Sequence, residues 1–177
     1  MAETNIIIAG FGGQGVLFTG KVMAYAGLID EKEISWLPSY GPEMRGGTAN
    51  CSVCISDRSI GSPLVTEPNI LVAMNTPSFD KFIGTVAAGG KVIVDSSLVK
   101  VNTTRTDVEI FEIPATQLSS DEDLQGLSNI IMLGKVLKET AFTSFESIEQ
   151  AIVKSIPPRK QHLLEPNMRA IKLGMSI

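Results

Sequence analysis

Short apolar runs, separated by polar or glycine-rich breaks, recur along the chain. Some of these runs are rich in Val and Ile and flanked by turn residues, which is typical of β-strands. Others space their apolar residues at helical intervals. Strands are predicted at residues 4–10, 33–37, 48–56, 69–75, 89–95 and 107–115, and helices at residues 14–29, 76–86, 127–141, 143–156 and 165–174.

This alternation of strands and helices predicts an α/β fold of three layers, α/β/α and Rossmann-like. We expect one domain over residues 1–177, because no internal repeat or low-complexity linker divides the sequence. The stretch 58–63 is a candidate partner for the strand at 48–56. The segment PSYGPEMRGG, residues 38–47, is predicted to be a loop, because prolines and glycines interrupt it.

The ends of the later helices carry recognisable signals. Ser144, with the residues at 147–150, resembles a capping box at the start of one helix. Pro166 lies early in the last helix, and Gly174 is expected to end it.

Composition narrows the class of protein. The chain has 15 Lys and Arg against 19 Asp and Glu, and no basic block, so we expect no nucleic-acid partner. No apolar run is long enough to cross a membrane, and the first residues lack a secretory signal, so a cytoplasmic protein without membrane contact is expected. The apolar content of 44% hints at a buried subunit interface.

The two cysteines, Cys51 and Cys54, form a CxxC pattern that invites a metal or redox interpretation. They fall in a predicted strand, where residues three apart point to opposite faces, so the thiols should diverge. A zinc or iron–sulfur site would also need more ligands, and the sole histidine, His162, is distant in sequence. We therefore expect two core cysteines and no metal in this chain.

The stretch GFGGQG, residues 10–15, matches GxGxxG between a predicted strand and a predicted helix. Such a loop suits an anion, because glycines allow close approach and the helix N-terminus is positive. A dinucleotide site also needs an acid at the end of the second strand, and the acids at 30–33 precede or begin that strand. A tight turn that only packs is therefore an open alternative, while a Walker loop is excluded. The candidate binding residues are Gly10, Gly12, Gly13, Gln14 and Gly15.

A second dense stretch, SYGPEMRGGTANC at residues 39–51, mixes Tyr40, Glu43 and Arg45 with glycines and prolines. Loops beside strand ends often carry binding residues, and a guanidinium suits a carboxylate or phosphate. Arg45 could equally pair with Glu43 or with a neighbouring subunit. These three residues complete the candidate ligand-binding set, and no catalytic residue is assigned.

Four segments follow one another along the chain with a distinctive order and spacing, namely GFGGQGVLFTGKVMAYAG, SWLPSYGPEMRGGTANCSV, IGSPLVTEPNILVAMN and NIIMLG. Together they resemble the gamma subunit of the 2-oxoacid:ferredoxin oxidoreductases, of the 2-oxoglutarate or branched-chain type. The resemblance covers nearly the whole chain. It implies an oxidoreductase of anaerobic metabolism that decarboxylates a 2-oxoacid, passes electrons to ferredoxin and forms an acyl-coenzyme A.

The resemblance also implies partners and cofactors. Alpha and beta subunits and a ferredoxin-like delta subunit are expected, with thiamine diphosphate, magnesium, iron–sulfur clusters and coenzyme A in the whole complex. No cofactor is expected to be held by this chain alone, which should be inactive by itself. Asn69 departs from the family, which often has Asp there. The alternatives are a free-standing NAD(P)-binding Rossmann oxidoreductase and an isolated small-molecule binder.

Overall fold

A computed structural model describes residues 3–40 and 48–177, with Tyr40 described by its backbone. The described residues form a six-stranded sheet in the order β2-β3-β1-β4-β5-β6. The last four strands in this order run parallel, whereas β3 is antiparallel to both of its neighbours. The strands are β1 (Thr4–Phe11), β2 (Glu33–Tyr40), β3 (Thr48–Ser56), β4 (Ile70–Ala73), β5 (Lys91–Asp95) and β6 (Glu109–Ile113).

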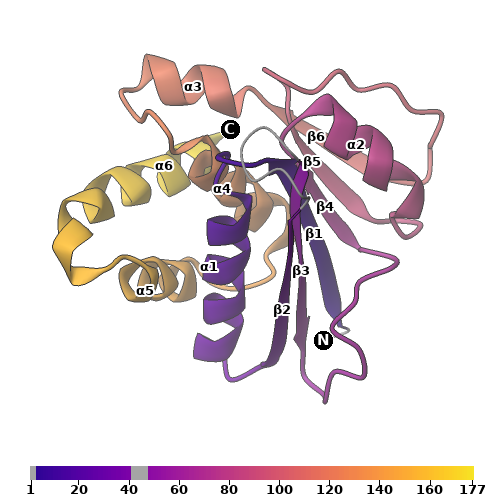
Figure 1. The fold of residues 1–177 in the computed structure, drawn as a ribbon, viewed down its shortest axis with the longest axis horizontal. Helices are drawn as coiled ribbons and strands as arrows, with labels where there is room; N and C mark the ends of the chain where they lie inside the picture. Colours follow the sequence, from indigo (N-terminus) through magenta and orange to yellow (C-terminus); the bar gives the residue numbers. More distant parts are fainter. Residues whose placement is uncertain (1–2, 41–47) are drawn as a thin grey trace.

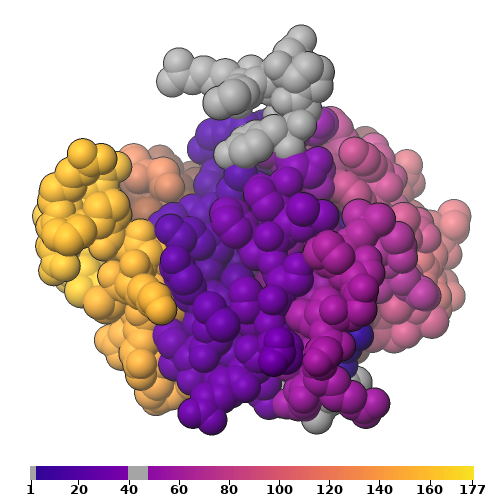
Figure 2. All heavy atoms as spheres, turned by 60° about the horizontal axis from the view of Figure 1, so that its bottom comes forward, coloured from indigo at the N-terminus to yellow at the C-terminus, as the bar shows by residue number. Residues whose placement is uncertain are grey.

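Helices cover the two faces of the sheet unequally. Four of them, α1, α4, α5 and α6, lie on one face, and α2 with residues 96–108 lies on the other (Figure 1). In Figure 2 the C-terminal helices, in orange and yellow, form one flank of the molecule, and the magenta and pink segments form the other. The helices are α1 (Val16–Ile29), α2 (Thr76–Phe82), α3 (Ala115–Asp121), α4 (Ser128–Thr140), α5 (Phe145–Ser155) and α6 (Leu164–Ser176), with 3₁₀ turns η1 (Ile83–Thr85) and η2 (Pro158–Leu163).

The apolar run of β1 follows from its central place in the sheet. Ile6 and Ile8 pack under α1 and α4, while Ile7 and Ala9 pack under α2. A strand buried on both faces needs apolar residues at every position, and therefore reads as a continuous run. The predicted three-layer α/β fold is confirmed. None of the helices in the described ranges is long and apolar enough to cross a membrane.

Several local predictions were wrong. Strand β2 continues through Pro38 to Tyr40, which was predicted to be loop. A proline is tolerated there because β2 is an edge strand, in which only the N–H groups that face β3 are needed for the ladder. Residues 58–63 form no strand, and β6 ends at Ile113, before the predicted residue 115. Helix α3 and turn η2 were not predicted, since both are short and begin at or beside a proline.

The signals at the helix starts were more reliable than the signal at the last helix end. Ser144 is the N-cap of α5, and its hydroxyl accepts a hydrogen bond from the Ser147 N–H at 3.0 Å, as predicted. Gly174 does not end α6, which continues to Ser176. Instead, the absence of a side chain at Gly174 allows close contact with α4.

Helices α4 and α6 touch backbone to backbone. A Cβ added at Gly174 would lie 1.9 Å from the Ile131 carbonyl oxygen, and one added at Gly134 would lie 2.2 Å from the Ile171 carbonyl oxygen. Both obstacles are main-chain atoms of the facing helix, so rotation of a side chain could not relieve the overlap. The separation of the two helices is therefore set by these two glycines.

We predict that Gly174→Ala lowers the free energy of unfolding by about 3 kcal/mol, because the helices must separate to admit the methyl group. Gly84→Ala is the matched control, since Gly84 also lies in helical backbone and has nothing within 4 Å of its added Cβ. It should change stability by less than about 1 kcal/mol. Urea denaturation of both variants tests this, and similar losses in the two would contradict the account of the glycine contact.

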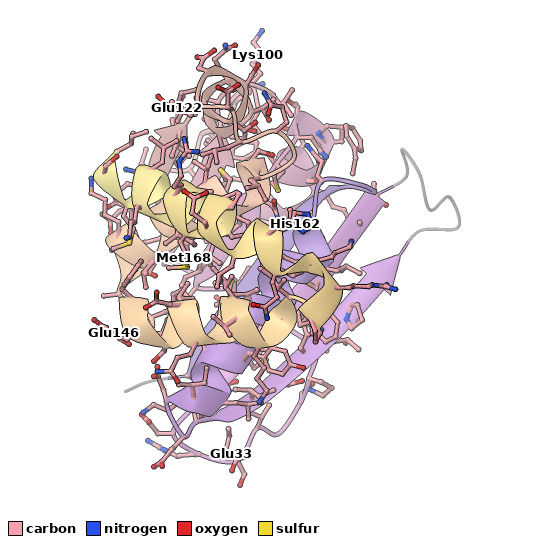
Figure 3. The ribbon with its side chains drawn as sticks, turned by 90° about the vertical axis from the view of Figure 1, so that its left-hand side faces the viewer. Glu33, Lys100, Glu122, Glu146, His162 and Met168 are labelled. Carbon is pink, nitrogen blue, oxygen red and sulfur yellow. The ribbon has the colours of Figure 1, made fainter. Side chains whose placement is uncertain are left out.

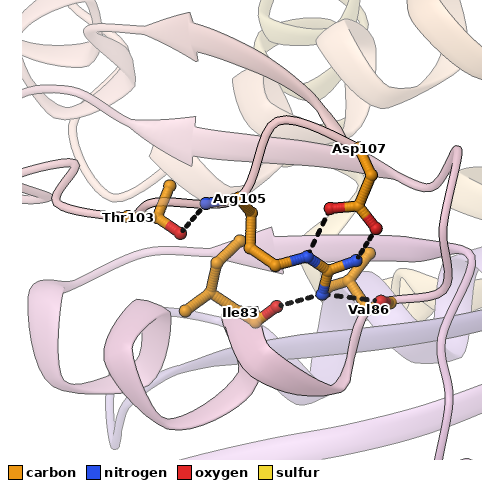
Figure 4. Close-up of polar contacts among 5 residues, drawn as sticks. All are labelled: Ile83, Val86, Thr103, Arg105 and Asp107. Carbon is orange, nitrogen blue, oxygen red and sulfur yellow. Dashed lines mark hydrogen bonds and ion pairs between the residues drawn. The ribbon is translucent and has the colours of Figure 1, made fainter.

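Arg105 fastens the segment 96–108 to the turn η1. Its Nε and Nη2 donate to the two carboxylate oxygens of Asp107 at 2.6 and 2.7 Å, and its Nη1 donates to the carbonyl oxygens of Ile83 and Val86 at 3.2 and 2.9 Å (Figure 4). One guanidinium thus joins the segment to both ends of η1, which follows α2 directly. The same contact lowers the pKa of Asp107 from its ordinary value of 3.8, chiefly through the hydrogen bonds from Arg105.

This lowered pKa predicts an acid-dependent loss of stability. The Arg105 contact stabilises the fold fully above about pH 4, where Asp107 is ionised in both folded and unfolded chains, and is lost as the pH falls through the lowered folded pKa. Asp107→Asn should therefore be less stable than wild type at pH 7, and the difference should shrink toward about pH 2. Urea titrations at both pH values measure it, with Asp80→Asn, an exposed aspartate on α2, as control. A difference independent of pH would refute the assignment.

Candidate ligand site at the glycine loop

Four of the five candidate residues, at 12–15, form the turn between β1 and α1, and the fifth, Gly10, lies near the end of β1. Strand β1 ends at Phe11 and α1 begins at Val16, with Gly15 as its N-cap. Gly13 and Gly15 have φ angles of 101° and 75°, in the left-handed region that favours glycine. The predicted strand–glycine loop–helix arrangement is therefore present, and the loop lies at the carboxyl end of β1.

Gln14 braces this turn from within. Its Oε1 accepts the Phe11 N–H at 2.6 Å and an Asn75 Nδ2–H at 3.2 Å, and its Nε2 donates to the Met74 carbonyl oxygen at 3.0 Å. Asn75 in turn caps α2 by accepting the Ser78 N–H at 2.9 Å. The side chain of Gln14 thus ties the end of β1 to the end of β4.

Two glycines of the motif are needed for internal packing. A Cβ at Gly10 would lie 2.6 Å from Gln14 Oε1, and one at Gly15 would lie 2.4 Å from Asn129 Nδ2. Asn129, at the start of α4, donates from that nitrogen to the Gly15 carbonyl oxygen at 3.2 Å and to Thr19 Oγ1 at 3.1 Å. Gly13, by contrast, has nothing within 4 Å of its added Cβ. The tip of the turn is therefore the part that is open to a ligand.

Two clefts flank the turn. The first, of about 340 Å³, is lined by Phe11 and Gly12 together with Ala49 of β3. The second, of about 400 Å³, lies toward α4 and η2 and is lined by Leu127 and Leu163 among others. Gly13, Gly15 and Phe18 line both clefts. An anion at the start of α1 could thus extend to either side.

The second predicted stretch reaches the same end of the sheet. The backbone of Tyr40 pairs with Ala49, and Ala49 pairs with Gly10, so Tyr40 lies two strands away from the glycine loop. Adjacent strands are about 4.8 Å apart, which puts these backbones within about 10 Å. Glu43 and Arg45 lie outside the described residues, and their predicted roles stay predictions.

A dinucleotide site would need an acidic side chain at the end of β2 to bind the ribose. Among the described residues of β2, no acidic side chain lies at that end. Glu33 pairs with Ser56, at the opposite end of β2 from the glycine loop, as the sequence indicated. Asp95 does end a parallel strand, but it is fully buried and its carboxylate accepts the Thr116 hydroxyl at 2.6 Å and the Ser97 N–H at 3.1 Å. Its oxygens are engaged in holding the start of α3.

The cysteines diverge as predicted. Cys51 packs on the α1 side of the sheet and Cys54 on the α2 side. Burial raises the pKa of Cys51 to about 12, and burial also raises that of Cys54, so both thiols stay protonated at neutral pH. Among residues 3–40 and 48–177, no three or more His, Cys, Asp or Glu side chains lie close enough together to hold a metal ion.

Asn69 has a structural place that its amide explains. Its Oδ1 accepts the Asn5 N–H and its Nδ2 donates to the Glu3 carbonyl oxygen, both at 2.9 Å. A carboxylate could make only the first of these bonds. The amide therefore joins the starts of β1 and β4, away from the glycine loop.

Sequence reasoning missed Asn129 and Asn75 as residues that shape the loop. Asn129 belongs to the segment NIIMLG, which contributes to the resemblance. Its place near the start of a predicted helix was the one signal that could have indicated a role for it. Asn75 precedes Thr76–Pro77, a typical helix start. Neither residue is near the loop in sequence, so only the fold brings them to it.

The family described as pyruvate ferredoxin/flavodoxin oxidoreductase matches residues 5–177. The 2-oxoglutarate synthase subunit KorC of Methanocaldococcus jannaschii is 38% identical over 176 residues, which cover 98% of this chain and 92% of that protein. The ketoisovalerate oxidoreductase subunit VorA of Methanothermobacter thermautotrophicus is 38% identical over 174 residues, which cover 97% of this chain and 36% of VorA. The chain thus spans about a third of the length of VorA and nearly all of KorC.

Solved structures agree with these relatives. The keto/oxoacid ferredoxin oxidoreductase gamma subunit of Geobacter sulfurreducens has a TM-score of 0.86 at 28% identity, over 99% of this chain and 96% of that one. The 2-oxoglutarate:ferredoxin oxidoreductase of Magnetococcus marinus has a TM-score of 0.89 at 18% identity, over 99% of this chain and 31% of that one, and shows a shared fold.

These matches confirm the resemblance carried by the four quoted segments. They do not favour a free-standing NAD(P)-binding oxidoreductase, whose ribose acid is also absent from the described end of β2. The chain therefore belongs to the pyruvate ferredoxin/flavodoxin oxidoreductase family, as the gamma subunit of a 2-oxoacid:ferredoxin oxidoreductase.

Proposed function

We propose that the complex containing this chain carries out coenzyme A-dependent oxidative decarboxylation of 2-oxoglutarate, with electrons passed to ferredoxin. The observation that carries the choice of substrate is the match to KorC over 92% of that protein's length. The proposed partners are alpha and beta subunits and a ferredoxin-like delta subunit, in the cytoplasm. Those subunits would hold thiamine diphosphate, magnesium and iron–sulfur clusters.

The proposed role of this chain is to hold an anionic group of coenzyme A at the tip of the glycine loop. Support comes from Gly13, which is open to a ligand, and from the start of α1, which has no side-chain cap. The free N–H groups and the dipole of such a helix end favour a phosphate. Gly12, Tyr40, Glu43 and Arg45 would complete the surface. Gly10, Gln14 and Gly15 would act by shaping the loop, since their contacts are internal.

A branched-chain 2-oxoacid is the second candidate substrate. VorA, named for ketoisovalerate, is as identical to this chain as KorC is, at 38%. The correspondence with VorA covers only 36% of that protein, whereas that with KorC extends over nearly the whole relative. The difference in coverage favours 2-oxoglutarate.

We predict that the complex, purified with its partner subunits, reduces a viologen dye in the presence of coenzyme A and 2-oxoglutarate. Ketoisovalerate should support a rate at least about tenfold lower. A substrate site that binds the side-chain carboxylate of 2-oxoglutarate would have its polar groups left unpaired by the aliphatic side chain of ketoisovalerate. A spectrophotometric assay with both oxoacids and pyruvate measures this. Activity with ketoisovalerate or pyruvate, but not with 2-oxoglutarate, would contradict the proposed substrate.

The role of the loop is tested by Gly13→Ala in the same complex. A methyl group at the open tip should raise the Michaelis constant for coenzyme A about tenfold, because it crowds the helix end and strains the turn. Gly89→Ala is the matched control, because Gly89 also has a positive φ, of 75°, and open space around its added Cβ. Both variants should lose similar stability, about 1–2 kcal/mol. An unchanged Michaelis constant in Gly13→Ala would show that the loop tip does not hold coenzyme A.

A further inference from the structure

Helix α1 is largely apolar on all sides, which distinguishes it from the other helices at the surface. Among its 14 residues, Lys21 is the one that carries a charge. Helices α5 and α6 instead place charged residues on their exposed sides, such as Glu146 and Arg169. Figure 3 looks onto α5 and α6 and shows Glu146 at the start of α5. A helix that is apolar on every side is typical of a helix that is buried on every side.

The fold buries only part of the surface of α1. On one side α1 lies against β2, where a Cβ added at Gly20 would lie 3.1 Å from Trp36 Nε1. On the other side it contacts α5, where Lys154 Nζ lies 5.0 Å from the centre of the Tyr25 ring. Between these two contacts, Leu28 is 46% exposed. Figure 1 shows α1 between α5 and β2, and in Figure 2 the purple atoms of this region form the middle of the molecule, between the orange and yellow helices and the magenta segments.

The surface between α5 and the edge of the sheet is called the α1 face below. Its members are Lys21, Tyr25, Leu28, Pro38 and Lys154. Positions 21, 25 and 28 are four and three residues apart, so their side chains lie on the same side of α1. Pro38 is exposed and pairs with Cys51, which packs on the α1 side of the sheet, so Pro38 points to that side too. Aromatic and aliphatic side chains with few charges are typical of the core of a protein–protein interface.

The two charged groups of the α1 face are both positive. Lys21 Nζ lies 5.4 Å and Lys154 Nζ 5.0 Å from the centre of the Tyr25 ring. Within residues 3–40 and 48–177, neither ammonium group forms an ion pair. The carboxylate of Asp30, just after α1, is bonded to hydroxyl groups at the start of α5. A carboxylate on a partner protein would therefore complement these two ammonium groups.

A second copy of this chain is less well matched to the α1 face. In a two-fold contact, the same patch of both copies meets. If such a contact were centred on Tyr25, Lys21 and Lys154 of one copy would lie beside the same two residues of the other. Like charges brought together in an interface oppose association. The face is better matched to a different protein, with an apolar patch and a carboxylate.

Relatives with this fold occur both as a subunit of their own and as part of a longer chain. The match with this chain covers 92% of KorC but 36% of VorA. In VorA, roughly two-thirds of the polypeptide is thus joined covalently to the part that resembles this chain. A subunit without that link is held in its complex by non-covalent contacts alone. Such contacts need a surface that is apolar at its centre.

We propose that the α1 face binds the partner subunit that corresponds to the unmatched part of VorA. Tyr25 and Leu28 would pack against an apolar patch of that subunit, and a carboxylate beside the patch would pair with Lys21 and Lys154. This inference rests on the proposed function, because it requires partner subunits. It does not depend on which oxoacid is the substrate or on coenzyme A at the glycine loop.

Mass photometry of the purified complex over a dilution series tests the contact. Leu28→Gln should raise the dissociation constant of this chain about tenfold or more, because an amide replaces an apolar side chain at the centre of the contact. Leu98→Gln is the matched control, since Leu98 is 45% exposed but lies in the segment 96–108 on the other flank, and it should change the constant less than about twofold. Equal constants for the two variants would overturn the proposal.

Zero-length cross-linking of the complex with a carbodiimide identifies the partner, because this reagent joins an amine to a carboxylate in contact with it. Lys21 or Lys154 should be joined to an Asp or Glu of the subunit that matches the rest of VorA. Lys81 is the matched control, since its Nζ lies 5.1 Å from the centre of the Phe82 ring on the other side of the sheet, and it should not be joined to that subunit. Links to a different subunit alone, or no links at all, would contradict the assignment.

Sedimentation of the chain alone separates this partner from a second copy. Wild type should sediment as a monomer at micromolar concentration. A dimer that Leu28→Gln dissociates would assign the α1 face to a second copy and overturn the proposal. All these measurements are made without an oxoacid, so activity with a substrate other than 2-oxoglutarate would contradict the proposed function and leave this inference standing.

Discussion

The backbone contact between α4 and α6 is the constraint on which the helical layer depends. With a glycine on each helix facing a carbonyl of the other, Gly134 and Gly174 leave no space between the two backbones. Helix α4 is therefore enclosed, with Asn129 to Leu137 all buried between the sheet and α6. Its position is fixed from outside by α6 and from inside by the sheet, so the residue at its start is held at a defined place.

That residue is Asn129, which transmits the position of α4 to the glycine loop. Its amide contacts the Gly15 carbonyl and Thr19, while Gln14 ties the other side of the loop to β4. These bonds hold Gln14 and Gly15 from within the protein, whereas the Gly12–Gly13 tip is left open. The loop is thus held by long-range contacts, which join residues 60 to 114 positions apart in the sequence.

Much of the fold could be predicted from the sequence, because local patterns determine it. The apolar run of β1, the cap at Ser144 and the divergence of Cys51 and Cys54 follow from period and position alone. The role of Gly174 could not be predicted, since a glycine near a helix end looks the same whether it ends the helix or faces another backbone. The same holds for the candidate site: the glycine loop was predicted from the sequence, whereas Asn129 and Asn75 act on it through contacts that exist only in the folded chain.

The antiparallel strand β3 has a consequence for how this fold could evolve or be redesigned. In a dinucleotide-binding sheet the neighbour of β1 is parallel, and its carboxyl end carries the acid that recognises the ribose. Here β3 occupies that place and presents its beginning, Thr48, beside Phe11. A side chain that is to reach a ribose at this end of the sheet would therefore have to come from the beginning of β3 rather than from the end of a parallel strand. In the described part of the chain, the missing ribose acid thus goes together with a chain topology that differs from that of a dinucleotide-binding sheet.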